Sequence, residues 1–187
     1  MAETILTAAP ALDDALVMGP NRVAERGDLS MVSVAIPQGG GPDLEEALQA
    51  AFALAMPAPL LGSDTGQIRA ISSGADQILL VFPHTAPRPA LFVAEKLAGA
   101  GYAVDQTDAL LMLEIVGPDT PAALERLCPL DFRGMGDGAA ARTVMDHIAV
   151  TLLRCEAERF QLICARSFAH SLLHAVETAY RDVIEPV

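Results

Sequence analysis

The chain has 187 residues, and its 24 acidic and 12 basic side chains give a formal net charge of −12 at neutral pH. Because proteins that bind phosphate backbones gather basic side chains, this balance argues against a nucleic acid partner. A hydrophobic fraction of 52% excludes general disorder, and no apolar run reaches the roughly 20 residues that a membrane-spanning helix needs.

The first half of the chain opens with residues 1–28, which show no sustained period and predict an arm. A strand follows, because Met31 and Ser33 alternate with Val32 and Val34 as in a strand with two different faces. The expected elements of this half are a strand at 29–36, a helix from 42 to about 57, strands at 67–71 and 78–82, a helix at 89–99 and a strand at 102–106.

The second half of the chain repeats much of this order. Its expected elements are a strand at 109–116, a helix at 120–127, a Gly-rich loop at 134–138, strands at 144–154 and 160–165, and a last helix from Ser167. The first half therefore reads β-α-β-β-α-β and the second β-α-β-β-α. This order predicts an α+β fold of two ferredoxin-like units in tandem.

We expect the N-terminal arm over 1–28 to be followed by one domain over 29–187. Within that domain the repeat predicts one half at 29–107 and another at 108–187.

The last helix places His170 and His174 four residues apart on its polar face, with Glu177 as a possible third ligand. Two imidazoles at this spacing can share a metal ion, although the HExxH pattern is absent. A solvated or partner-binding polar face is the alternative. Glycines at 39–41 and 134–138 similarly allow a phosphate cradle, but neither cluster fits GxGxxG or a P-loop, which favours flexible loops.

The cysteines are Cys128, Cys155 and Cys164, which lack CxxC spacing and predict reduced, buried thiols in a cytoplasmic protein. The N-terminal segment has no basic cluster, so we expect no secretory signal.

Candidates for nucleophilic or acid–base chemistry are few. Cys128 has His147 as its one distinctive candidate base, and Asp131 and Asp137 are candidate paired carboxylates. The sequence shows no cleft that would raise the pKa of either carboxyl group.

Four segments in the second half carry a family resemblance when they are read in order. They are LCPLD at 127–131, ART at 141–143, IAVTLLR at 148–154 and FQLICARS at 160–167. Together they resemble the gamma subunit of heterotetrameric sarcosine oxidase, most strongly over residues 124–176. The resemblance implies a fold related to the folate-binding domain of aminomethyltransferases.

The resemblance also implies a role. The complex oxidatively demethylates sarcosine to glycine and passes the one-carbon unit to tetrahydrofolate. Its gamma subunit would pack mainly against the alpha subunit, in a complex with beta and delta, and would hold no active site. FAD, FMN, NAD, tetrahydrofolate and zinc would lie in the partner subunits, so no catalytic, cofactor-binding or metal residue is expected in this chain.

Physical roles can be assigned to the residues of the resembling segments. Pro129 should end the preceding helix, and Asp131 should accept backbone N–H groups in the next turn. Arg142 and Arg166 are suited to bidentate pairing with a carboxylate or a backbone carbonyl, either inside the chain or at an interface. Ser167 should cap the last helix. The structural or partner-interface candidates are Cys128, Pro129, Leu130, Asp131, Arg142, Thr143, Arg166 and Ser167.

Three functions remain open from the sequence. A non-catalytic gamma subunit, of sarcosine oxidase or of another N-methyl amino acid dehydrogenase, predicts an exposed apolar patch and allows a homodimer when the chain is isolated. A free-standing folate-binding one-carbon transfer protein predicts a closed pocket with convergent polar groups, such as a carboxylate for the pterin ring. A small metal-binding protein would use His170 and His174.

Overall fold

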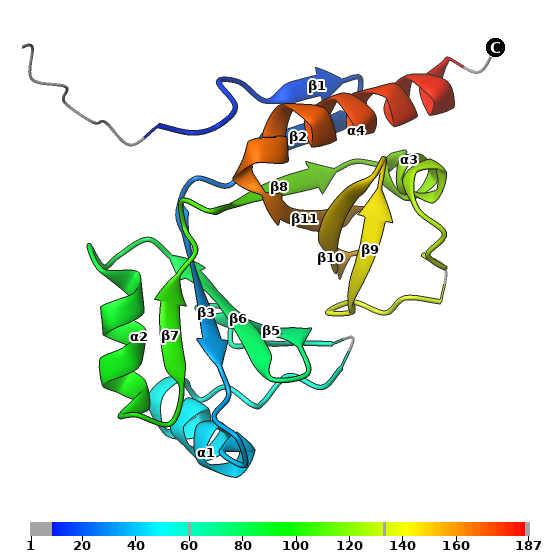
Figure 1. Cartoon of the computed structure of the whole chain (residues 1–187). Coiled ribbons are helices and arrows are strands. Elements are labelled where there is room, and N and C mark those ends of the chain that lie inside the picture. Colours follow the sequence, from blue (N-terminus) through cyan, green and yellow to red (C-terminus); the bar gives the residue numbers. More distant parts are fainter. Residues whose placement is uncertain (1–8, 60, 133, 186–187) are drawn as a thin grey trace, which may run out of the picture.

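A computed structural model describes residues 9–59, 61–132 and 134–185, which form two antiparallel sheets facing each other, with helices on their outer sides (Figure 1). Each sheet buries a cluster of apolar side chains beneath its helices, and a third cluster lies between the two sheets. The chain is therefore layered as helices, sheet, sheet and helices. No helix of the described residues has both the length and the apolar character needed to cross a membrane.

The first sheet has the strand order β4-β5-β6-β3-β7. The last four of these strands have the order and antiparallel pairing of a ferredoxin-like unit. Leu44 and Leu48 of α1 and Val93 and Leu97 of α2 are fully buried on the outer face of this sheet, as their helical spacing requires. The elements are β3 (Leu29–Ala35), α1 (Gly41–Phe52), β4 (Gly62–Asp64), β5 (Arg69–Gly74), β6 (Gln77–Pro83), α2 (Pro89–Leu97) and β7 (Tyr102–Asp105).

The second sheet has the strand order β1-β2-β8-β11-β10-β9. Its outer face is covered by α3 and α4, which pack against each other. The elements are β1 (Leu16–Met18), β2 (Asn21–Glu25), β8 (Leu110–Val116), α3 (Thr120–Leu127), β9 (Ala140–Met145), β10 (Ile148–Glu156), β11 (Arg159–Ala165), a 3₁₀ turn (Arg166–Phe168) and α4 (Ala169–Ile184).

The predicted α+β class and the tandem ferredoxin-like arrangement are confirmed. The fourth strand of the second unit, however, comes from the N-terminal segment. Strand β2 lies antiparallel beside β8, in the position that a strand after α4 would otherwise take, and Val23 is buried in the core beneath α3 and α4. Part of the segment expected to be an arm is thus a strand of this sheet.

Two further expectations about local structure are wrong. The strand predicted over 144–154 is broken by a two-residue turn at Asp146 and His147, both at positive φ, which joins β9 to β10 as a hairpin. Ser167 does not cap the last helix. It lies in the 3₁₀ turn, and α4 begins one residue after Phe168, with no side-chain cap.

Strand alternation decides which side chains meet between the sheets. Met31 and Leu79 point inward from the first sheet, and Met112, Leu153 and Ile163 point inward from the second. Val32 and Val34 point to the opposite side, beneath α1 and α2, as their alternation with Met31 and Ser33 predicts.

Candidate functional site

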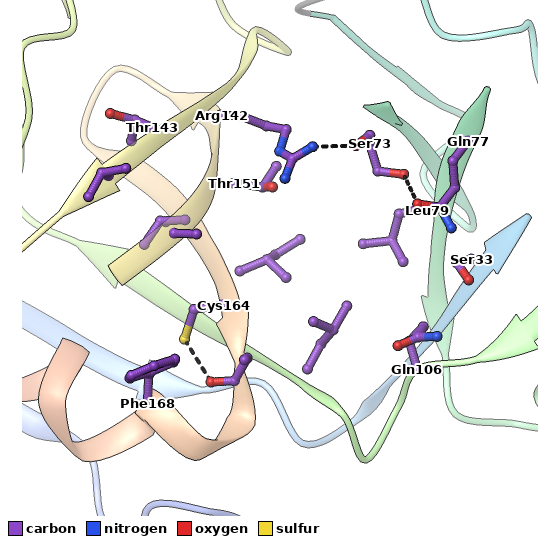
Figure 2. A pocket seen from close by; sticks show the side chains of 16 residues that line it. Ser33, Ser73, Gln77, Leu79, Gln106, Arg142, Thr143, Thr151, Cys164 and Phe168 are labelled. Carbon is purple, nitrogen blue, oxygen red and sulfur yellow. Dashed lines mark hydrogen bonds between the residues drawn. The ribbon is translucent and has the colours of Figure 1, made fainter. Parts of the chain in front are cut away.

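A groove of about 630 Å³ lies between the inner faces of the two sheets (Figure 2). Leu79 and Ile163 of the intersheet cluster also line it, so the groove adjoins that cluster. Its lining residues are Ser33, Ser73, Gln77, Leu79, Gln106, Leu110, Arg142, Thr143, Val144, Ala149, Val150, Thr151, Ile163, Cys164, Ala165 and Phe168.

Arg142 is the one charged residue among the described residues of this lining. Its Nη1 donates a hydrogen bond of 2.7 Å to the backbone carbonyl of Ser73, which joins β9 of one sheet to β5 of the other. This confirms the prediction that Arg142 pairs with a carboxylate or a carbonyl. The guanidinium is exposed and has four further N–H donors on the groove side of the molecule.

Three polar side chains of the lining make no hydrogen bond with the described part of the chain: Ser33, Gln106 and Thr151. Ser33 is only 7% exposed, and Figure 2 shows it on the side of the groove opposite Cys164 and Phe168. The Ser33 hydroxyl is not among the fully buried polar atoms that lack a partner, so solvent reaches it. The groove therefore offers polar groups to water or to an incoming molecule.

The rim of the groove exposes large apolar side chains. Val144 is 56% exposed and Phe168 is 46% exposed. On the first sheet Val104 is paired opposite Ser33 in register, so it shares the inner face with Ser33, and it is 53% exposed. Of these three, Val144 and Phe168 line the groove, and we call these two the apolar rim. It fits the exposed patch expected of a subunit separated from its complex.

The opposite end of the intersheet space is filled by paired charges. Glu114 of β8 accepts hydrogen bonds from Arg26 Nη1 at 3.0 Å and from Arg159 Nη2 at 2.7 Å. The Gln161 amide lies beside it, and its Oε1 accepts a bond of 2.7 Å from Arg69 Nη1 on the first sheet. We call Arg26, Arg69, Glu114, Arg159 and Gln161 the polar network. Only about 210 Å³ of open space remains there.

The LCPLD segment forms a packed turn after α3. Cys128 is extended and ends the helix after Leu127, as Pro129 predicts. The side chain of Asp131 accepts the Gly134 N–H at 3.0 Å, which confirms the predicted turn. Leu130 packs against the core beneath α3 and α4.

The Cys128 thiol has the wrong surroundings for a nucleophile. It is 5% exposed, and its burial raises the pKa of the thiol. His147 lies exposed in the β9–β10 turn, and no hydrogen bond joins it to Cys128 in the described structure. Asp137 lies 3.4 Å from Arg154 Nε and not in a carboxylate pair.

Arg166 ties the N-terminal segment to the second sheet. Its Nη1 lies 3.4 Å from Glu25 Oε1, and its Nη2 donates to the carbonyl of Ala9. Glu25 Oε2 accepts the N–H of Leu12 at 2.8 Å. Of the two alternatives weighed for Arg166, the structure contains the internal ion pair.

The metal hypothesis finds no support around His170 and His174. Glu177, the possible third ligand, forms an ion pair with Arg181. Among the described residues no group of three His, Cys, Asp or Glu side chains could hold a metal ion.

Sequence reasoning missed the groove. The one sequence feature that could have indicated the groove is the alternation that puts Ser33 on the same face as Met31. This alternation places a hydroxyl on a face that is otherwise apolar. The strands on the two sides of the groove are far apart in sequence, so no local pattern could bring Ser73 and Arg142 together.

Comparison with known proteins gives one curated relative. The sarcosine oxidase subunit gamma of Corynebacterium sp. (strain P-1) is 29% identical over 117 residues. The predicted resemblance to a sarcosine oxidase gamma subunit is confirmed. The match covers 61% of this chain and 58% of the relative, so the chain spans somewhat more than half of that subunit. No family model matches the chain.

Two solved structures share the fold. The heterotetrameric sarcosine oxidase from Corynebacterium sp. U-96 contains a chain that aligns with a TM-score of 0.76 and 23% identity, covering 87% of this chain and 86% of that chain. The glycine cleavage system aminomethyltransferase T from Bartonella henselae aligns with a TM-score of 0.60 and 13% identity over 82% of this chain and 44% of that chain. At these identities the likeness concerns the fold.

Proposed function

We propose that this chain is a non-catalytic gamma subunit of a heterotetrameric sarcosine oxidase, with a structural role against the alpha subunit. The similarity to the curated sarcosine oxidase subunit gamma carries this proposal. The complex would oxidise sarcosine to glycine and transfer the one-carbon unit to tetrahydrofolate.

The chain's own chemistry supports a structural role. The Cys128 thiol is buried, and burial likewise raises the pKa of the Cys164 thiol to about 11, so both thiols stay protonated at neutral pH. The apolar rim is available for a partner. We therefore assign FAD, FMN, NAD, tetrahydrofolate and zinc to the alpha, beta and delta subunits. The three free cysteines favour a cytoplasmic complex.

A free-standing folate-binding protein is the second candidate, favoured by the aminomethyltransferase-like fold and by the volume of the groove. The groove lacks two features that this function requires. It is open along its rim, and its described lining contains no carboxylate for a pterin ring. A gamma-like subunit of another N-methyl amino acid dehydrogenase would use the same surfaces as the sarcosine oxidase subunit.

Purification of the tagged full chain from its native host tests the proposal. We expect flavoprotein subunits to be recovered with it, visible by their flavin absorbance, and the recovered complex to oxidise sarcosine. A preparation that oxidises another N-methyl amino acid and not sarcosine would identify the related complex. A chain recovered alone that binds tetrahydrofolate would replace the proposal with the second candidate.

A further inference from the structure

The intersheet groove has the composition of an interface centre. Its lining is mainly apolar, and Arg142 and Phe168 belong to residue types that are enriched at protein–protein interfaces. Charged groups other than Arg142 are absent from the described lining. The groove therefore fits apolar side chains together with one negative charge placed near Arg142.

The exposed rim distinguishes a protein segment from a small molecule. A volume of about 630 Å³ would admit a small ligand. Val144 and Phe168 line the groove and are also 56% and 46% exposed, so a ligand confined to the groove would cover only part of their apolar surface. A polypeptide that enters the groove covers its rim at the same time.

The charge of the chain disfavours a second copy as the occupant. Two copies, each with a net charge of −12, repel each other as they approach. A different subunit can place one carboxylate on Arg142 without bringing this excess of acidic residues.

We propose that the groove receives a protruding segment of a partner subunit, which carries apolar side chains and one carboxylate that pairs with Arg142. The exposed donors of Arg142 allow a bidentate pair with that carboxylate while Nη1 keeps its bond to Ser73. The hydroxyls of Ser33 and Thr151 and the amide of Gln106 supply hydrogen bonds to the backbone of the segment. This inference rests on the proposed function, since it requires a hetero-oligomeric complex.

Site-specific photo-cross-linking in the native host tests the occupant. A benzophenone side chain replaces Phe168 in the tagged full chain, and mass spectrometry identifies the peptide that it captures. We expect one segment of a flavoprotein subunit, with an Asp or Glu close to the captured residue. The matched control places the same probe at Val17, which is 65% exposed on β1, and should not capture that segment.

Charge reversal tests the role of Arg142. Arg142→Glu should lower the recovery of the flavoprotein subunits about tenfold or more, since it puts two carboxylates together. Arg142→Lys should give an intermediate loss, and Arg22→Glu, an exposed arginine of β2, should give none. Phe168→Glu is a second variant that breaks no hydrogen bond between the sheets. Thermal unfolding checks that each variant is folded.

The outcomes separate the two proposals. If the wild-type chain recovers flavoprotein subunits and Arg142→Glu and Phe168→Glu recover them equally well, the groove proposal is wrong and the proposed function stands. Cross-links to a second copy of this chain, or a small molecule that stays bound to this chain when native mass spectrometry separates it from the partner subunits, would also overturn it. If the wild-type chain recovers no flavoprotein subunit, both proposals are wrong.

Discussion

The two ends of the space between the sheets share strands β5, β8 and β11 and differ in how their charges are arranged. At one end Glu114, 12% exposed, is held between Arg26 and Arg159, and the polar network leaves about 210 Å³ open. At the other end Arg142 is the one charge beside about 630 Å³ of largely apolar groove. At the first end the charges are paired within the chain, so no other molecule is needed to neutralise them. At the second end the apolar surface and the one cation are left for another molecule to cover.

The largest expected effect belongs to the polar network. Glu114→Gln should lower the free energy of unfolding by about 3 kcal/mol, because it removes the one carboxylate that Arg26 and Arg159 share. Urea denaturation of the isolated chain measures this change. Glu158→Gln, in an exposed turn, is the control and should change the stability by less than about 0.5 kcal/mol. Equal effects of the two substitutions would contradict the contrast between the ends.

Gln161→Leu should have a smaller effect, of about 1 kcal/mol, at the same end. Gln161 is 6% exposed and accepts the bond from Arg69 Nη1, so its removal costs one buried hydrogen bond across the sheets. Combined with Glu114→Gln, its effect should be less than additive, since the two side chains are in contact. Full additivity would show that they do not act as one network.

A fall in pH should destabilise the polar network, which depends on the ionised Glu114 carboxylate, before it affects the groove. Burial opposes the charge of Glu114, but the hydrogen bond and the attraction of Arg159, together with Arg26, lower the pKa of this carboxyl below its ordinary value of 4.5. A carboxyl whose pKa is lowered by folding stabilises the folded chain above its unfolded-state pKa, and this contribution is lost as the pH falls through the folded-state value. We expect Glu114→Gln to reduce the loss of stability below pH 4.5, measured by denaturation at several pH values. Unchanged acid sensitivity would assign the effect to other carboxylates.

The smallest expected effect on the isolated chain is at the apolar rim. Phe168→Ser and Val144→Ser should each change the free energy of unfolding by less than about 0.5 kcal/mol, because both side chains are largely exposed. The same substitutions should lower the recovery of partner subunits severalfold in the native host. A loss of stability as large as that of Glu114→Gln would show that the rim belongs to the core of the chain.

Much of the fold could be predicted from the sequence because local patterns determine it. The alternation around Met31 placed β3 and its two faces, and the Pro129 and Asp131 turn was predicted from the restrictions of one proline and one short carboxylate. The burial of Thr120 at the start of α3, where its hydroxyl pairs with that of Tyr180, carries no such local pattern.

Contacts between distant segments could not be predicted. The strand alternation of β2 is short, and only its pairing with β8 identifies it as a strand of the second unit. The strand predicted over 144–154 is interrupted because Asp146 and His147 adopt positive φ. The alternation of the residues on either side gives no sign of this turn. The groove depends on the angle between two sheets, a quantity that no local pattern of residues records.

The contribution of β2 to the second unit sets a condition on how the chain folds during synthesis. Arg26, just beyond β2, and its partner Glu114 are 88 residues apart. At about 5–20 residues per second, the N-terminal strand would be synthesised roughly 4–18 s before β8. During that interval the first ferredoxin-like unit can form, while Val23 and its neighbours remain unburied. A chaperone or a tag bound near the N-terminus would therefore affect a strand of the second unit before most of that unit has been synthesised.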